Sequence, residues 1–460
     1  MDAFELELMR RSPLAAAVLE ISDFVFSDEF LDSLYDRYRG RCYQDVLGFS
    51  QFLCLMRDAL THHGGSAHQL FLDLERKEKQ PVDESNFYRK LARMPVQVSR
   101  ALLREGTQRL GQLQPCNLVK LPDCFDGFTV VAGDGKKIKK AAGRLKPTRG
   151  YSGGLLGAKA LVALNLRNGL AIAMSDSLDG LTNDVPLVPE LMQQLYQVIA
   201  GPLLSVWDRQ FEDIRTFGHL AQRPGDAFVV RMRKGDAIYT VESCVESRDE
   251  QGRRVLDEIV VLSRGKNKPK EAMRLRRVTL VRQGEEDIVL VSNLLDRHKY
   301  SAADLLSLYR FRWNIEQVFQ QVTETFSLEH LIGCMPRAVL MQFAFCLLLY
   351  NLVQVIKAYL AEDGGVLATV VSTFYLFNDM RRELTAWAYH TSGVWPHMHR
   401  DASAMRKRLS ELMRGVWNPI AYTKAADKKP RGKPKTKIQL HGGHSSVQRL
   451  LEGRARVIAK

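Results

Sequence analysis

The sequence predicts an α/β protein in which a mixed β-sheet core is interrupted by a β-rich insertion and flanked by helical regions at both ends. Three patterns lead to this class. Short β-branched runs alternate with helical periodicity between residues 128 and 232. Four further strand-like runs follow between residues 238 and 291, separated by turn residues. Helical periodicity fills residues 1–115 and returns from residue 305.

The composition favours a polyanionic partner. The chain has 460 residues and a hydrophobic content of 45%, which is typical of a globular core. Its length suits about two to four domains. The formal net charge is +14 and the pI about 9.4. A basic balance of this size indicates nucleic acid first and an anionic membrane surface second.

Other general features point to the cytoplasm. The seven cysteines are dispersed without a CxxC pair, which predicts reduced thiols and neither a zinc nor a disulfide framework. The N-terminal residues are too acidic for a signal peptide, and the apolar run Phe343–Val353 is too short to span a bilayer. Since we find no basic amphipathic helix with aromatic anchors, we expect no membrane partner.

The N-terminal helical region, residues 1–115, contains a candidate DNA-binding element. Ser66–Glu75 and Asp83–Arg93 read as two short helices joined by a turn, with Asp83 as an N-cap. Arg89 and Lys90 lie on the second helix, which suits a helix-turn-helix that enters a major groove. The alternative is an ordinary solvated helix hairpin.

The first candidate carboxylate is Asp134. A buried strand is predicted at 128–132, and the glycines on both sides of Asp134 predict a sharp turn that exposes its carboxylate at the strand tip. Lys136 and Lys137 begin a basic cluster that would hold phosphates beside this site. Tight turns and solvated charge runs are the alternatives.

The second candidate carboxylate, Asp208, follows the predicted strand Leu203–Trp207. Before it come a predicted hairpin of two strands at 159–175 and a helix at Asn183–Ile199, and after it come a helix and the strand Asp226–Met232. This order of three strands, helix, strand, helix and strand matches a ribonuclease H-like core. The alternative for Asp208 is an ordinary helix cap.

The third candidate carboxylate, Glu316, lies on a predicted helix, Leu305–Thr323. Helical spacing gives this segment one apolar side, with Tyr309, Arg312 and Glu316 in a stripe beside it. A rigid helix would fix a catalytic carboxylate well. The alternative is an Arg312–Glu316 ion pair on a half-exposed helix.

Together, the three motifs resemble the DDE-type transposases of bacterial insertion sequences, in the group with the Y-R-E-K signature. Tyr309, Arg312 and Glu316 match the first three signature positions, whereas Thr323 stands where that group has Lys. The resembling transposases also carry a β-rich insertion before the Glu helix. The resemblance covers roughly residues 128–323.

The resemblance and the carboxylates imply a mechanism. Three converging carboxylates stay ionised only with cations, and oxygen ligands suit Mg²⁺ or Mn²⁺. We therefore expect Asp134, Asp208 and Glu316 to hold two such ions for phosphodiester cleavage and strand transfer. The resemblance implies that Tyr309 and Arg312 contact DNA phosphate, and Trp313 beside them is a candidate for stacking on a base or for the core.

The expected partners are DNA, as terminal inverted repeats and target, and a second copy on paired ends, without a nucleotide cofactor. A bacterial protein associated with the nucleoid is implied. The alternatives are a DNA-binding protein derived from a transposase whose catalysis is lost, which the Thr323 departure motivates, and a nuclease without strand transfer.

The predicted organisation has six parts. They are a helical DNA-binding region, the first part of the catalytic core, a β-rich insertion, the end of the core with the Glu helix, a C-terminal helical region and a basic tail, at residues 1–115, 116–235, 236–298, 299–334, 335–422 and 423–460.

Overall fold

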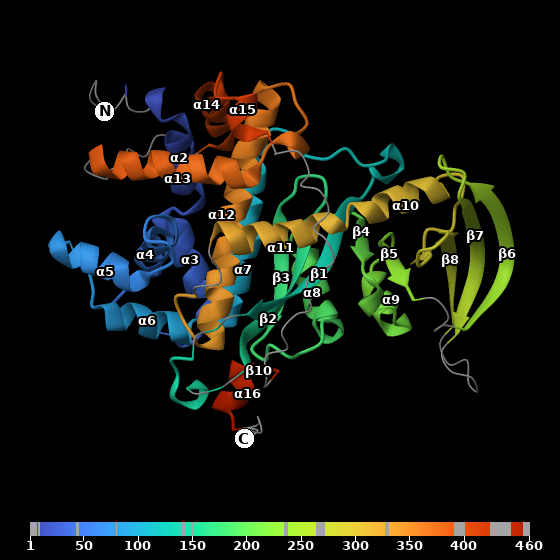
Figure 1. The fold of residues 1–460 in the computed structure, drawn as a ribbon, viewed down its shortest axis with the longest axis horizontal. Coiled ribbons are helices and arrows are strands. Elements are labelled where there is room, and N and C mark those ends of the chain that lie inside the picture. The colour runs from blue at the N-terminus through green and yellow to red at the C-terminus, as the bar shows by residue number, and fades with distance from the viewer. Residues whose placement is uncertain are drawn as a thin grey trace.

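A continuous mixed β-sheet runs through the molecule, with most of the helices at one end and the outermost strands at the other (Figure 1). The structure, a computed structural model, describes residues 7, 10–42, 46–79, 81–139, 141, 143–149, 151, 153–233, 238–263, 272–326, 331–390, 401–423 and 443–453. Within these ranges, ten strands belong to the one sheet.

The N-terminal region is helical, as predicted. Its helices are α2 (Pro13–Val25), α3 (Asp28–Tyr38), α4 (Phe49–Thr61), α5 (Ala67–Arg76), α6 (Glu84–Arg93) and α7 (Val96–Leu113). The Ser66 hydroxyl accepts a hydrogen bond from the Gln69 amide and so caps α5, whereas Asp83 precedes α6 without a side-chain cap bond. The predicted pair of short helices is therefore present as α5 and α6.

The core sheet has the strand order β3-β2-β1-β4-β5. Its strands and the two helices between them are β1 (Thr129–Lys139), β2 (Gly154–Asn165), β3 (Ala171–Ser177), α8 (Val188–Tyr196), β4 (Leu203–Trp207), α9 (Ile214–Leu220) and β5 (Ala227–Met232). The first three strands pair antiparallel, whereas β4 and β5 run parallel to β1. This is the arrangement expected of a ribonuclease H-like core, so the predicted fold class is confirmed.

The path of β1 differs from the prediction. The strand does not end before Asp134 but continues through it to Lys139, and neither Gly133 nor Gly135 has a positive φ. These glycines instead leave space for neighbouring side chains. A Cβ at Gly133 would lie 2.2 Å from the Trp207 ring, and one at Gly135 would lie 2.1 Å from the Asp184 carboxylate. Close packing, and not a turn, explains the two glycines.

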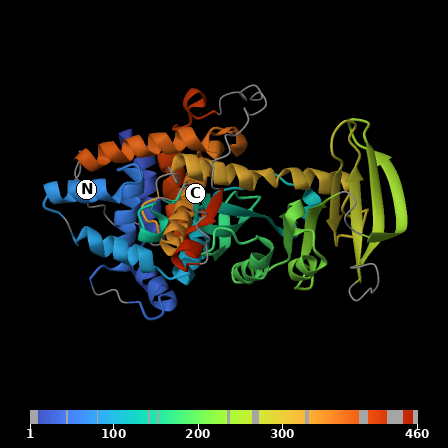
Figure 2. The ribbon, with the colours of Figure 1, turned by 60° about the horizontal axis from the view of Figure 1, so that its bottom comes forward.

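The inserted strands extend the core sheet and do not form a sheet of their own. They are β6 (Ile238–Arg248), β7 (Arg254–Ser263), β8 (Ala272–Leu280) and β9 (Ile288–Ser292). β9 pairs antiparallel with β5, and β8, β7 and β6 follow outward (Figure 2). The insertion is thus joined to the core by backbone hydrogen bonds. Residues 264–271, between β7 and β8, lie outside the described residues.

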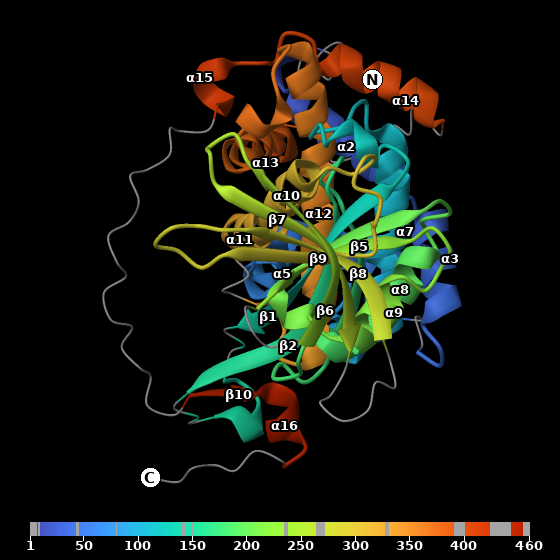
Figure 3. The same cartoon turned by 90° about the vertical axis from the view of Figure 1, so that its right-hand side faces the viewer.

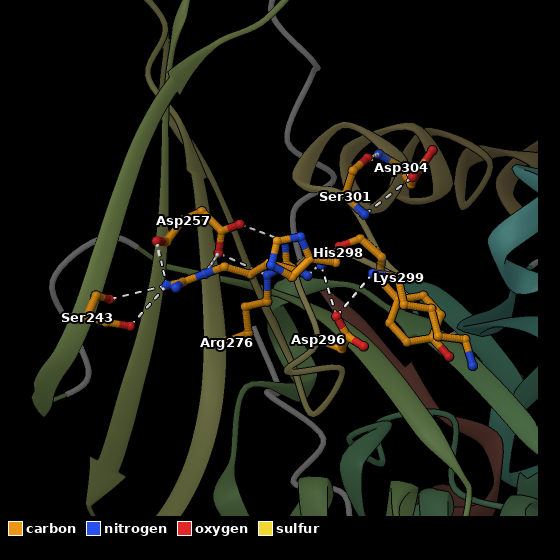
Figure 4. Close-up of polar contacts among 10 residues, drawn as sticks. Ser243, Asp257, Arg276, Asp296, His298, Lys299, Ser301 and Asp304 are labelled. Carbon is orange, nitrogen blue, oxygen red and sulfur yellow. Dashed lines mark hydrogen bonds and ion pairs between the residues drawn. The ribbon is translucent and has the colours of Figure 1, made fainter.

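A buried polar network ties the inserted strands to the segment that follows β9 (Figure 4). Arg276 on β8 donates to both carboxylate oxygens of Asp257 on β7, at 2.9 and 2.6 Å, and to the carbonyl oxygen of Tyr300 at 2.5 Å. Ser301 and Asp304 then form a capping box that starts the next helix. The start of that helix is therefore fixed to the insertion.

The C-terminal region covers the sheet. Its helices are α12 (Pro336–Asp363), α13 (Thr373–His390), α14 (Ala402–Met413), α15 (Pro419–Tyr422) and α16 (Val447–Leu451). α12 is the one helix in the described ranges that is long and apolar enough to cross a membrane, but its whole apolar stretch is buried inside the protein. It packs in the large core beside the face of β1 that carries Val130 and Ala132, whereas α8 and α9 cover the face that carries Val131.

The end of the chain returns to the core sheet. β10 (His444–Ser446) pairs parallel with β2, and α16 lies beside it (Figure 3). Arg449 forms an ion pair with Asp179 at 2.7 Å. Residues 424–442, which include the basic run of the sequence, lie outside the described residues.

Candidate active site

The predicted helix with the Tyr-Arg-Glu stripe is two helices, α10 (Ala302–Arg310) and α11 (Trp313–Thr325). The junction is held by tighter bonds of the 3₁₀ type, from the Arg312 amide to the Tyr309 carbonyl at 3.1 Å and from the Ile315 amide to the Arg312 carbonyl at 3.2 Å. The predicted apolar side is buried, with Leu308, Ile315, Val318 and Val322 in the core. The stripe therefore spans a helix junction that packs firmly on the protein.

Two of the three stripe residues are buried, and their polar atoms meet the predicted carboxylates. Arg312 is 3% exposed, and its Nη2 donates to Glu316 Oε1 at 2.7 Å. The Tyr309 hydroxyl lies 3.4 Å from Asp208 Oδ1 and donates to it. The Arg312–Glu316 pair is thus real, but it is not the half-exposed surface pair of the alternative, because the guanidinium is inside the protein.

The register of the parallel strands brings the two aspartates together. Gly133 on β1 is the register partner of Trp207 on β4. Asp134 and Asp208 are therefore the next residues along these two neighbouring segments. Both line a pocket of about 510 Å³. Glu316 lines an adjoining pocket of about 430 Å³, and Lys136 and Thr323 line both. The three predicted carboxylates therefore line two adjoining pockets that share Lys136 and Thr323.

The electrostatics of Asp134 also reflect this convergence. The pKa of Asp134 is raised to about 6, mainly by burial and also by the negative charges of Glu316 and Asp184, whereas the Gly135 amide and the Arg312 guanidinium act to lower it. The carboxylates are thus close enough to act on one another. A carboxylate in such surroundings is ionised at neutral pH at a cost that a bound cation would remove.

The sequence of this part of the chain decides its family. Residues 124–352 match the family model described as the transposase DDE domain. The chain carries a transposase DDE domain. The match begins before β1 and ends within α12, so it includes all three carboxylates. The assignment gives the protein a function in DNA transposition and recombination.

Two further comparisons add little. A solved structure of a piggyBac transposase synaptic complex with hairpin DNA is 12% identical, with 93% of this chain and 88% of that chain covered, but the TM-score of 0.36 is too low to support an argument. Among curated proteins, no sequence matches.

The three carboxylates of the transposase domain are chemically suited to bind a divalent cation. Within the described residues, no group of three or more His, Cys, Asp or Glu side chains has the spacing of a complete metal site. However, Asp134, Asp208 and Glu316 offer only oxygen atoms, which Mg²⁺ and Mn²⁺ prefer. The raised pKa of Asp134, caused mainly by burial and also by Glu316 and Asp184, further indicates that the ionised carboxylate is incompletely compensated. The donor set therefore fits such an ion.

The predicted DNA-contacting residues differ in their accessibility. Trp313 is 54% exposed, which excludes the core alternative for it. Lys137 is exposed, and Lys136 lies half-buried with its Nζ 5.6 Å from the centre of the Phe319 ring. These three side chains stand near the carboxylates on an open surface.

The two DNA-binding residues predicted on α6, Arg89 and Lys90, differ in where their side chains lie. Arg89 is exposed. Lys90 points inward: its Nζ donates to the Leu47 carbonyl at 2.6 Å and lies 4.6 Å from the centre of the Tyr35 ring, and burial lowers its pKa to about 8. The placement of Lys90 does not fit a contact with a DNA groove, because its ammonium group already contacts Leu47 and Tyr35 within the helical region.

The sequence interpretation missed a buried ion pair at the site. Lys159 on β2 and Asp184, just before α8, line the same pocket as Asp134. Their Nζ and Oδ1 atoms are 2.5 Å apart. Neither position is marked locally, because Lys159 reads as a strand residue and Asp184 as a helix cap. Only the three-dimensional pairing reveals them.

Proposed function

We propose that this transposase cleaves DNA at the ends of an insertion sequence and joins those ends to target DNA, with Asp134, Asp208 and Glu316 as the catalytic residues. The convergence of the three carboxylates on the end of β4 carries the proposal. When bound by them, two Mg²⁺ or Mn²⁺ ions supply the activation of water or a 3′-OH and the stabilisation of the leaving oxygen.

Arg312 and Tyr309 would orient the DNA strand. The buried Nε and Nη1 atoms of Arg312 have no hydrogen-bond partner in the described part of the chain. Such donors are costly to leave unpaired, and phosphate oxygens satisfy a guanidinium well. The Tyr309 hydroxyl would hold the Asp208 carboxylate in place beside that phosphate.

Lys136, Lys137 and Trp313 form the proposed outer contacts. The lysines would bind the phosphates of the flanking strand, and Trp313 would stack on an unpaired base. Lys136 lines both pockets together with Thr323, which supports a role for Lys136 in supplying the charge that the signature Lys would have given at position 323.

The remaining parts of the proposal concern partners. The α5–α6 pair with Arg89 would bind the terminal inverted repeats, and two copies would hold the paired ends. Transposition exchanges phosphodiester bonds, so no nucleotide cofactor is needed. The protein would act on the nucleoid in the bacterial cytoplasm.

The test is cleavage of DNA that carries the inverted repeats flanking the gene, with Mg²⁺, by the wild type and by Glu316→Gln. We expect cleavage at the repeat ends and joined products from the wild type only. Cleavage without joined products would favour a nuclease. Specific binding without cleavage in either Mg²⁺ or Mn²⁺ would favour a transposase-derived DNA-binding protein, for which Thr323→Lys is the next variant.

A further inference from the structure

The Lys159–Asp184 pair is an unusual feature of the pocket wall. The Lys159 and Asp184 side chains are only 4% and 7% exposed, and Nζ and Oδ1 are 2.5 Å apart. Removing two charges from water is costly, and apolar residues of similar size often give equal or greater stability. A buried pair at this place therefore calls for a role that apolar residues would not fill.

The Asp184 carboxylate lies against the backbone that carries Asp134. A Cβ at Gly135 would be 2.1 Å from Asp184 Oδ1, so the carboxylate occupies the space that a side chain at 135 would need. Side chains alternate along a strand, so Asp134 projects to the opposite face of β1. The two carboxylates thus approach β1 from opposite faces, one residue apart.

The charge of Asp184 is only partly neutralised. Its Oδ1 atom lies 2.5 Å from Lys159 Nζ, and no other hydrogen-bond partner of that atom is found among the residues that the structure describes, so Lys159 is the compensating group. Lys159 lies on β2 opposite Lys137 of β1, two register pairs beyond Gly135. The negative end of the pair is therefore the end in contact with Gly135.

We propose that Lys159 and Asp184 are a positioning pair that sets the cation affinity of the carboxylate site. Asp184 places a negative charge behind Asp134, and Lys159 holds that carboxylate in place through the ion pair. The inference rests on the proposed function, because it requires Asp134 to bind the cation. It adds a determinant of cation affinity that contacts neither the cation nor DNA.

The test measures Mn²⁺ binding to the full-length protein without DNA, by electron paramagnetic resonance of the free ion. For Asp184→Asn we expect affinity weaker by about tenfold, the size expected for loss of one nearby charge in partly screened surroundings. Lys159→Arg, which keeps the charge, should bind Mn²⁺ as the wild type does. Unchanged affinity in a folded Asp184→Asn protein would overturn the inference.

A matched control comes from a second buried pair in the same sheet. Asp176 on β3 pairs with Arg100 at 2.5 Å, and its side chain is 3% exposed, but neither residue lines the pocket. Asp176→Asn should leave Mn²⁺ affinity unchanged. An equal loss in both variants would mean a general structural effect and would contradict the positioning role.

Two more variants keep the test decisive. If Asp184→Asn does not fold, the double variant Lys159→Met with Asp184→Asn leaves no unpaired charge, and it must still bind Mn²⁺ more weakly. Asp134→Asn separates the inference from the proposed function. If Asp134→Asn abolishes binding and Asp184→Asn does not weaken it, only the inference fails; if Asp134→Asn binds normally, the proposed metal site fails as well.

Discussion

Replacing Gly133 by Ala tests whether close packing between β1 and β4 builds the site. The new Cβ would lie 2.2, 2.3 and 2.6 Å from three ring atoms of Trp207, where contacts of about 3.4–4 Å are ordinary. Trp207 is fully buried and packs on Phe211 with ring centres 4.7 Å apart, so the ring has nowhere to move. The two strands β1 and β4 must move apart instead.

The expected cost follows from this overlap. Overpacking of a core usually costs about 1–3 kcal/mol and occasionally more, and an overlap above 1 Å with a fixed aromatic ring belongs at the upper end. We therefore expect Gly133→Ala to lower the free energy of unfolding by about 3 kcal/mol. The rate of DNA cleavage should fall by more than the loss of folded protein explains. The reason is that Asp134 and Asp208 directly follow Gly133 and Trp207, the two residues that are forced apart.

Chemical denaturation and the inverted-repeat cleavage assay measure the two effects. Gly111→Ala on α7 is the control, since a Cβ there meets no atom within 4 Å in the described residues, and it should fold and cleave normally. Adding Trp207→Phe to Gly133→Ala should recover part of the stability. A Gly133→Ala protein with unchanged unfolding and cleavage would refute the packing argument.

Three further predictions concern charge and docking. Because the folded state raises the pKa of Asp134 from 3.8 to about 6, the wild type should lose stability relative to Asp134→Asn as pH rises from about 4 to about 6. Asp257→Ala should lower the free energy of unfolding by about 3–5 kcal/mol, because it leaves the fully buried Arg276 without its carboxylate. Val447→Asp should release β10 from β2 and speed hydrogen exchange of the β10 amides, since Val447 is fully buried.

Each of these has its own check. Identical denaturation curves for the wild type and Asp134→Asn at pH 4 and pH 7 would contradict the burial argument. Glu246→Ala, which removes a surface partner of Arg254, should change the free energy of unfolding far less than Asp257→Ala does. The β10 prediction fails if the exchange rates in Val447→Asp match those of the wild type.

Local pattern was enough to predict the features that depend on neighbouring residues. The stripe on α10 and α11, the order of strands and helices in the core and the place of Asp208 directly after β4 all follow from periodicity along short segments. Glu316 could be placed beside a buried helix face because Ile315, Phe319 and Val322 fall on one apolar side of the segment.

Features that depend on distant residues escaped prediction. Gly133 seemed to belong to a turn because Trp207, which explains it, is far away in the sequence. Lys90 looked like a surface charge until its contacts with Leu47 and Tyr35 were visible. The 3₁₀ bonds at Arg312 and the docking of β10 likewise depend on tertiary packing that overrides local propensity.

The added strands have a consequence for the solubility of the protein. Growth of the sheet beyond β5 moves its outer edge to β6, where every residue from Thr240 to Arg248 is exposed, Val241 and Val245 included. A long free edge is a template for unwanted pairing between molecules. Glu242 and Glu246 place charges along this edge, each held by an arginine at 2.7 Å. We therefore expect these acidic residues to oppose edge-to-edge pairing in concentrated protein.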